Sequence, residues 1–119
     1  MKITSFNPMV ASPKAEDIIS LFEALGFEKR HEKKEVNDTV GSHIRMTDPN
    51  GNHFDVGSAP LLPHDRMMIR MNVDDFEEAS ALLAAHGFTV EKTAETESSK
   101  SAALVSPSGF SILLIQHYK

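Results

Sequence analysis

Two periodicities alternate along the chain and predict the same order of elements twice. The segments 3–10 and 67–73 are predicted strands, although Pro8 must then lie at an edge or a bulge. After the first of these segments, Ile18, Phe22 and Leu25 recur at helical spacing and form one expected buried stripe. Shorter alternating segments come next in both halves. The pattern therefore predicts the series strand, helix, strand, strand, strand, followed by the same series again.

Both predicted helices carry start signals. Ser12 and Pro13 combine a capping hydroxyl with a proline at the first helical position. Asp74, with Glu77 three residues later, is a capping-box pattern. These residues predict helices that begin directly after positions 12 and 74. The predicted core face of the second helix consists of Phe76, Ala79, Leu82 and Leu83.

Short motifs repeat in the same order along the chain, which indicates a duplicated architecture. The sequence Leu-Gly-Phe or His-Gly-Phe closes each predicted helix, and Asp-Pro-Asn-Gly or Ser-Pro-Ser-Gly fills each predicted hairpin turn. Glycine and proline at such positions are typical of helix ends and turns. We therefore predict a first module at about residues 1–57, a linker at about 58–66 and a second module at about 67–119.

This order resembles the vicinal oxygen chelate superfamily, which includes glyoxalase I, bleomycin-resistance proteins and extradiol dioxygenases. The likeness rests on the helix that ends in Leu-Gly-Phe at 25–27 and the Asp-Pro-Asn-Gly-Asn turn at 48–52, in tandem with their counterparts. It covers nearly the whole chain. The resemblance implies a single α+β domain: two tandem βαβββ modules form a curved mixed sheet around a cup-shaped cavity, with the helices on the outer face. It does not imply one reaction, because a fold can host many.

The register of the first hairpin decides which side chains share a face. A type I turn with Gly51 in the left-handed bulge position pairs Asp48 with Asn52, and so places Arg45 opposite Asp55. The apolar face of the hairpin then packs under the helix, and the other face either meets water or, as the resemblance implies, lines the cup. The apolar set is Ile44, Met46, Phe54 and Val56, and the polar set is His43, Arg45, Thr47, His53 and Asp55.

The second module presents a more apolar face to the expected cavity. In its hairpin, Ala102, Leu104, Ile112 and Leu114 are predicted to face the helix, and Ser101, Ala103, Val105, Ser111, Leu113 and Ile115 the cup. In its leading strand, Met68, Arg70 and Asn72 alternate with the core residues Ile69, Met71 and Val73. A strand that is apolar on both faces favours a covered cavity or a subunit interface.

Composition and charge narrow the possible partners. The chain has 119 residues, 40% of them hydrophobic, which suits one globular domain. Its net charge of −5 argues against an extended basic surface that would bind nucleic acid or anionic lipid. The absence of cysteine excludes disulfides and thiolate chemistry. With no signal-peptide pattern and no membrane-length apolar run, we expect a cytoplasmic protein without nucleic-acid or membrane partners.

The resemblance also implies positions for a metal. Metal-binding members take one ligand from the first strand and one carboxylate from the last strand of each module. These positions map to Asp55 and Leu113 in the last strands, to Met68 in the second leading strand, and to Ser5 or Asn7 in the first. Of the mapped residues, only Asp55 is a good ligand for a hard divalent metal. We therefore expect no metal site and no cofactor, while an improvised divalent site around His53 and Asp55 stays open.

The sequence supports two hypotheses of different classes. The first is a glyoxalase/bleomycin-resistance-like protein that binds a small molecule in the cup, and we expect it to be a homodimer without the usual divalent metal. Arg45 and Arg70 would meet the anionic or polar part of the ligand, although an Arg45–Asp55 salt bridge is an equally good role for Arg45. The second is an enzyme, a metal-dependent lyase, isomerase or dioxygenase that uses His53 and Asp55 as ligands or as acid and base. The predicted ligand-binding residues are Asn7, His43, Arg45, His53, Asp55, Met68, Arg70, Val105, Leu113 and Ile115.

Overall fold

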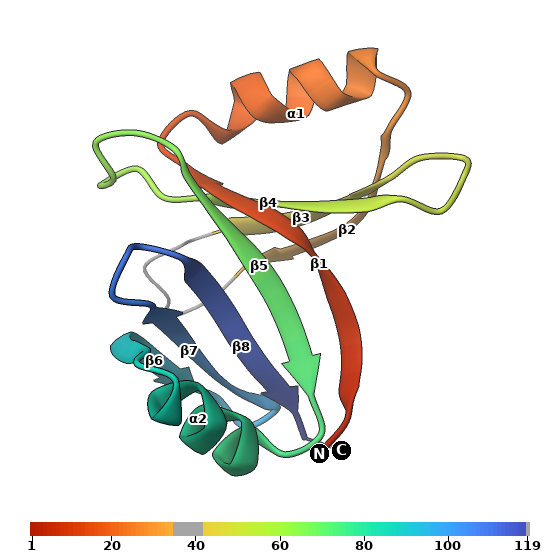
Figure 1. Ribbon diagram of the computed structural model, residues 1–119. Coiled ribbons are helices and arrows are strands. Elements are labelled where there is room, and N and C mark those ends of the chain that lie inside the picture. Colours follow the sequence, from red (N-terminus) through yellow and green to blue (C-terminus); the bar gives the residue numbers. More distant parts are fainter. Residues whose placement is uncertain (35–41, 119) are drawn as a thin grey trace. The chain divides into compact units, whose positions relative to one another are not determined.

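The computed structural model describes residues 1–34 and 42–118, and in this part of the chain the predicted series of elements occurs twice (Figure 1). The α+β class and the two βαβββ repeats are thereby confirmed. The first repeat comprises β1 (Ile3–Ser12), α1 (Ala15–Ala24), β2 (Glu28–Lys34), β3 (Ser42–Thr47) and β4 (His53–Ser58). The second comprises β5 (Arg66–Val73), α2 (Phe76–Ala85), β6 (Thr89–Glu95), β7 (Ser99–Val105) and β8 (Ser111–His117).

The chain divides into two compact units, and β1 contributes to both. The N-terminal unit is Asn7–Met67, and the C-terminal unit combines Met1–Phe6 with Met68–Lys119. Lys2, directly before β1, is held within the C-terminal unit: its backbone amide donates to the Asp74 carboxylate at 2.6 Å, and the Asp74 amide donates to the Lys2 carbonyl at 3.1 Å.

Each unit contains four strands in an equivalent order. The order is β2-β3-β4-β1 in the N-terminal unit and β5-β8-β7-β6 in the C-terminal unit. In both, a parallel pair (β1 with β4, β5 with β8) is followed by antiparallel neighbours. One helix packs on one face of each four-stranded arrangement, so the opposite face of each hairpin points away from its helix (Figure 1).

The cores contain the strand residues that alternation assigned to them, except Ile69, which is half-buried and lies outside the C-terminal core. Phe22 of α1 stacks on Phe54 of β4 with ring centroids 4.4 Å apart and meets Phe27 edge-on at 5.2 Å. Because strand side chains alternate between faces, the apolar set of each hairpin lies together under its helix. The N-terminal core is formed by Val10, Ile19, Ile44, Met46, Phe54 and Val56, and the C-terminal core by Met71, Val73, Phe76, Ala79, Ala102, Leu104, Ile112 and Leu114.

Both predicted helix starts are wrong by a short distance. Helix α1 is preceded by Lys14 and has no side-chain cap; Ser12 ends β1 instead, where its hydroxyl accepts from the Lys14 amide at 3.0 Å. The cap of α2 is Asp75, whose carboxylate accepts from the Glu78 amide at 3.0 Å. Asp74 is already occupied by the Lys2 amide. The neighbouring aspartate therefore takes the capping position, which sequence spacing alone did not distinguish.

Two leucines assigned to buried stripes are exposed. Leu25 has 62% of its surface exposed and Leu82 has 51%. Leu25 follows the last residue of α1, and Ile19, one position from the predicted stripe, is the buried residue of that helix. In α2 the buried residues are Phe76 and Ala79, and Leu83 packs against the edge of the core. Helix positions near an end are therefore less reliably placed by spacing than strand positions.

Candidate functional site

The turn between β3 and β4 fixes the register that sequence analysis predicted. Gly51 has a φ of 86°, which suits glycine in a left-handed bulge position. The Asp48 carboxylate accepts from the backbone amides of Asn50 at 3.0 Å and Asn52 at 2.8 Å, and from the Asn52 side-chain amide at 2.9 Å. The side-chain bond from Asn52 is the main reason that the pKa of Asp48 lies below its usual range. The turn thus places Arg45 directly opposite Asp55, as predicted.

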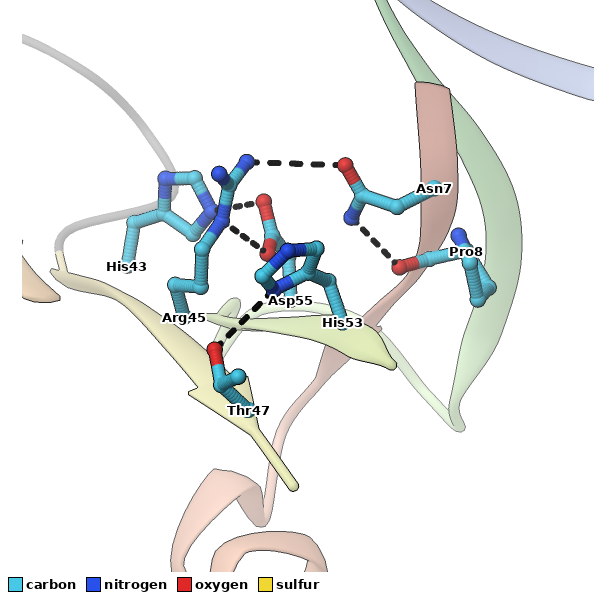
Figure 2. A network of polar contacts seen from close by, with 7 residues as sticks. All are labelled: Asn7, Pro8, His43, Arg45, Thr47, His53 and Asp55. Carbon is cyan, nitrogen blue, oxygen red and sulfur yellow. Dashed lines mark hydrogen bonds and ion pairs between the residues drawn. The ribbon is translucent and has the colours of Figure 1, made fainter. Parts of the chain in front are cut away.

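Asp55 is the centre of the polar face of this hairpin (Figure 2). Its side chain is fully buried. One carboxylate oxygen lies 2.9 Å from Nε2 of His43, and the other accepts from Nε of Arg45 at 3.1 Å. The side chains of His43 and Arg45 are 14% and 28% exposed. A buried carboxylate needs such partners, because an unpaired charge away from water is costly. The predicted Arg45–Asp55 salt bridge is confirmed.

Asn7 connects β1 to this network. Nη2 of Arg45 lies 3.5 Å from the Asn7 carboxamide oxygen, and the Asn7 amide nitrogen donates to the carbonyl of Pro8 at 3.0 Å (Figure 2). Asn7 is buried, and its strand runs parallel to β4 with Met9 paired to Asp55. The Pro8 carbonyl is a backbone group with no sequence signal of its own. It holds the Asn7 amide so that the carboxamide oxygen faces Arg45.

His53 belongs to a separate contact on the same face. Its Nδ1 lies 3.0 Å from the hydroxyl of Thr47, the residue paired with it across the hairpin. His53 and Asp55 are two positions apart on one strand, which predicted that the two side chains act together. In the structure, the histidine that contacts Asp55 is His43, from the neighbouring strand. The proposed catalytic roles of His53 and Asp55 stay predictions.

The other predicted site residues lie in the C-terminal unit. Arg70 of β5 pairs with Leu113 of β8, which in turn pairs with Ala103 of β7. Residues paired across a sheet share a face, and the flanking pair of Ile69 with Ile112 belongs to the helix side. The structure thus divides the predicted set by unit: Asn7, His43, Arg45, His53 and Asp55 lie in the N-terminal unit, and Met68, Arg70, Val105, Leu113 and Ile115 in the C-terminal unit.

A hollow in the N-terminal unit lies away from these residues. It has a volume of about 470 Å³ and opens at the start of α1, on the helix side of the hairpin. Two of its walls, Ile44 and Val56, belong to the apolar face of the strands, so the polar network lies on the opposite face. The lining residues are Pro13, Lys14, Ala15, Glu16, Asp17, Ile19, Ile44, Val56 and Ser58.

The donor set does not fit the divalent metal that the superfamily resemblance implies. The Asp55 carboxylate is engaged by His43 and Arg45, and a guanidinium beside it opposes a second cation. At the corresponding position of the second repeat, Leu113 has no donor atom. The described residues contain no group of three or more His, Cys, Asp or Glu side chains placed to hold a metal ion.

Comparisons with known proteins identify the fold. A protein from Staphylococcus aureus matches with a TM-score of 0.69 and 17% identity over 99% of this chain and 100% of its own. A glyoxalase/bleomycin resistance protein/dioxygenase superfamily member from Vibrio splendidus matches with a TM-score of 0.62 and 18% identity over 97% and 99%. A variant of glyoxalase I from Zea mays matches with a TM-score of 0.66 and 17% identity over 98% of this chain and 44% of the maize protein.

At these identities the likeness shows the fold alone. The chain has the fold of the glyoxalase/bleomycin resistance/dioxygenase superfamily, as its sequence motifs suggested, and it spans less than half the length of the maize enzyme. No family model and no curated protein matches the sequence. In the described part of the chain, no helix is both long and apolar enough to cross a membrane.

Proposed function

We propose that this chain, with its glyoxalase/bleomycin-resistance-like fold, is a small-molecule-binding protein that works without a divalent metal. The observation that carries the proposal is that the buried Asp55 carboxylate contacts Arg45 and His43. The superfamily resemblance assigns this strand position to a metal ligand, yet here the carboxylate is bound to Arg45 and His43. In this proposal the positive charge beside Asp55 comes from the Arg45 guanidinium.

Each hairpin has a face that supports binding of a small molecule. The face around Asp55 carries hydrogen-bonding groups, whereas the corresponding face of the C-terminal hairpin carries Leu113 and Ile115. A concave site that combines apolar surface with a few fixed polar groups is typical of small-molecule recognition. The polar face of the N-terminal hairpin suits the polar part of a ligand, and the apolar face of the C-terminal hairpin, tested through Leu113, is a candidate surface of its own.

A screen of the purified chain with a fragment library of acids, amides and hydrocarbons tests this function. We expect fragments that raise the melting temperature of the parent chain to lose this effect in Leu113→Glu, because a carboxylate repels both the apolar and the acidic part of a ligand. Leu21→Glu is the matched control, since Leu21 lies on α1 and is 53% exposed. If no fragment binds the parent chain, the proposed function is wrong. If the two variants bind every fragment equally well, the face around Leu113 is not a binding surface.

The second candidate is an acid–base enzyme, and the contact between His43 and Asp55 favours it. A carboxylate that orients an imidazole is a common arrangement in proton transfer. The bound fragments distinguish the two candidates: incubation followed by product analysis shows turnover for an enzyme and unchanged fragments for a binding protein. The homodimer and the compartment predicted from the sequence stay predictions.

A further inference from the structure

The nitrogen atoms of Arg45 have different roles in the network. Nε donates to Asp55 at 3.1 Å, and Nη2 donates to Asn7 at 3.5 Å. A guanidinium has five N–H donors in one plane. Two of them are used in these bonds, and among the described residues none accepts from Nη1. The outer end of the guanidinium, formed by Nη1 and the remaining hydrogen of Nη2, carries donors that these two bonds do not use.

This outer end is held in place before any ligand arrives. The fully buried Asp55 fixes the Nε side of the guanidinium, and Asn7, itself fixed by the Pro8 carbonyl, contacts Nη2 (Figure 2). The Arg45 side chain nonetheless keeps 28% of its surface exposed. An arginine that is already ordered loses less conformational entropy on binding than one that moves freely in water. Arg45 is thus suited to be an anchor for a ligand as well as a structural ion pair.

The neighbouring groups limit the ligand's chemistry. On the polar face of the hairpin, the Asp55 carboxylate forms an ion pair with Arg45. The Asn7 oxygen and the Thr47 hydroxyl already have partners. The N–H groups of Arg45 that are not used in these bonds can only donate hydrogen bonds, so they suit a ligand group that accepts them. A dianion such as a phosphate would bring more negative charge close to the Asp55 carboxylate than a monoanion would, which is electrostatically less favourable.

From this geometry we propose that the ligand carries a carboxylate and that Arg45 binds it end-on through Nη1 and Nη2. The inference rests on the proposed function and names the ligand class for the same site. The planar pair of carboxylate oxygens matches the fork of a guanidinium, and such bidentate pairs are stronger and more specific than single hydrogen bonds. A lysine at this position would keep the charge but lose the fork.

The test uses three carboxylates, benzoate, cyclohexanecarboxylate and 4-phenylbutyrate, each beside its primary amide, in NMR titrations of the full chain. We expect the acids to bind more tightly than their amides and to shift the side-chain nitrogen resonances of Arg45. Arg45→Lys should weaken binding of the acids about tenfold or more, because charge-assisted hydrogen bonds are lost. Arg30→Lys, on the exposed edge strand β2, is the matched control and should leave binding unchanged.

Asn7→Ala is a second variant, which keeps the ion pair of Arg45 with Asp55 but removes the acceptor of Nη2. It should weaken binding of the acids several-fold, and it provides a test even if Arg45→Lys does not fold. The inference is overturned if the amides bind as tightly as the acids, if phenyl phosphate binds more tightly than benzoate, or if folded Arg45→Lys binds the acids normally. It is also overturned if the fragment screen finds ligands but none of these acids binds. In each of these cases a small molecule still binds, and the proposed function stands. Absence of any ligand in the screen contradicts both.

Discussion

Replacement of Asp55 by alanine is expected to lower the free energy of unfolding by about 3 kcal/mol, since it removes one side of a buried ion pair. The carboxylate is fully buried, and its loss leaves the Arg45 guanidinium and the His43 ring facing a site without their acceptor. Arg45 keeps some contact with water, which limits the penalty. Urea unfolding followed by circular dichroism measures the change.

Glu97→Ala is the control for this experiment. Glu97 is exposed in the connection between β6 and β7, and its removal should change the free energy of unfolding by less than about 0.5 kcal/mol. A double-mutant cycle of Asp55→Ala with Arg45→Ala should show that the two losses are not additive, because the residues are in direct contact. Equal effects of Asp55→Ala and Glu97→Ala, or full additivity in the cycle, would contradict the ion pair.

Leu114→Ala is expected to lower the free energy of unfolding by about 3 kcal/mol, through lost burial and the cavity that remains. Leu114 is fully buried in the C-terminal core, where it pairs with Met71 on β5 and Ala102 on β7. The change in urea midpoint, at an unchanged slope, measures this effect.

Leu82→Ala is the matched control, because it makes the same chemical change on α2 at a position that is 51% exposed. It should cost less than about 1 kcal/mol, since little apolar surface is lost and alanine is the better helix former. A larger loss in Leu82→Ala than in Leu114→Ala would show that α2 buries the face predicted from sequence spacing rather than the one in the structure.

Strand registers could be predicted from the sequence because the turn residues and the period of two act together. Gly51 and Asp48 specify one bulged turn, and any shift of the strands by one residue would mix apolar and polar side chains on both faces. That reasoning correctly placed Arg45 opposite Asp55 and the apolar set under the helix.

The finer features of the site and of the helix ends could not be predicted in the same way. Spacing along one strand suggested that His53 would act with Asp55, whereas the contact comes from His43 on the neighbouring strand. The ring orientations of the two histidines decide this, and they cannot be predicted from residue spacing. Likewise, Asp74 and Asp75 are both good caps, and the bond from the Lys2 amide, far away in sequence, decides which one caps α2.

The metal content of the protein purified without chelator tests most directly whether Arg45 and His43 have taken the place of a metal at Asp55. We predict no stoichiometric divalent metal by elemental analysis, and no selective broadening of the amide resonances of β3 and β4 when Mn²⁺ is added. One metal ion per chain, lost from Asp55→Ala but retained in Glu97→Ala, would contradict the account.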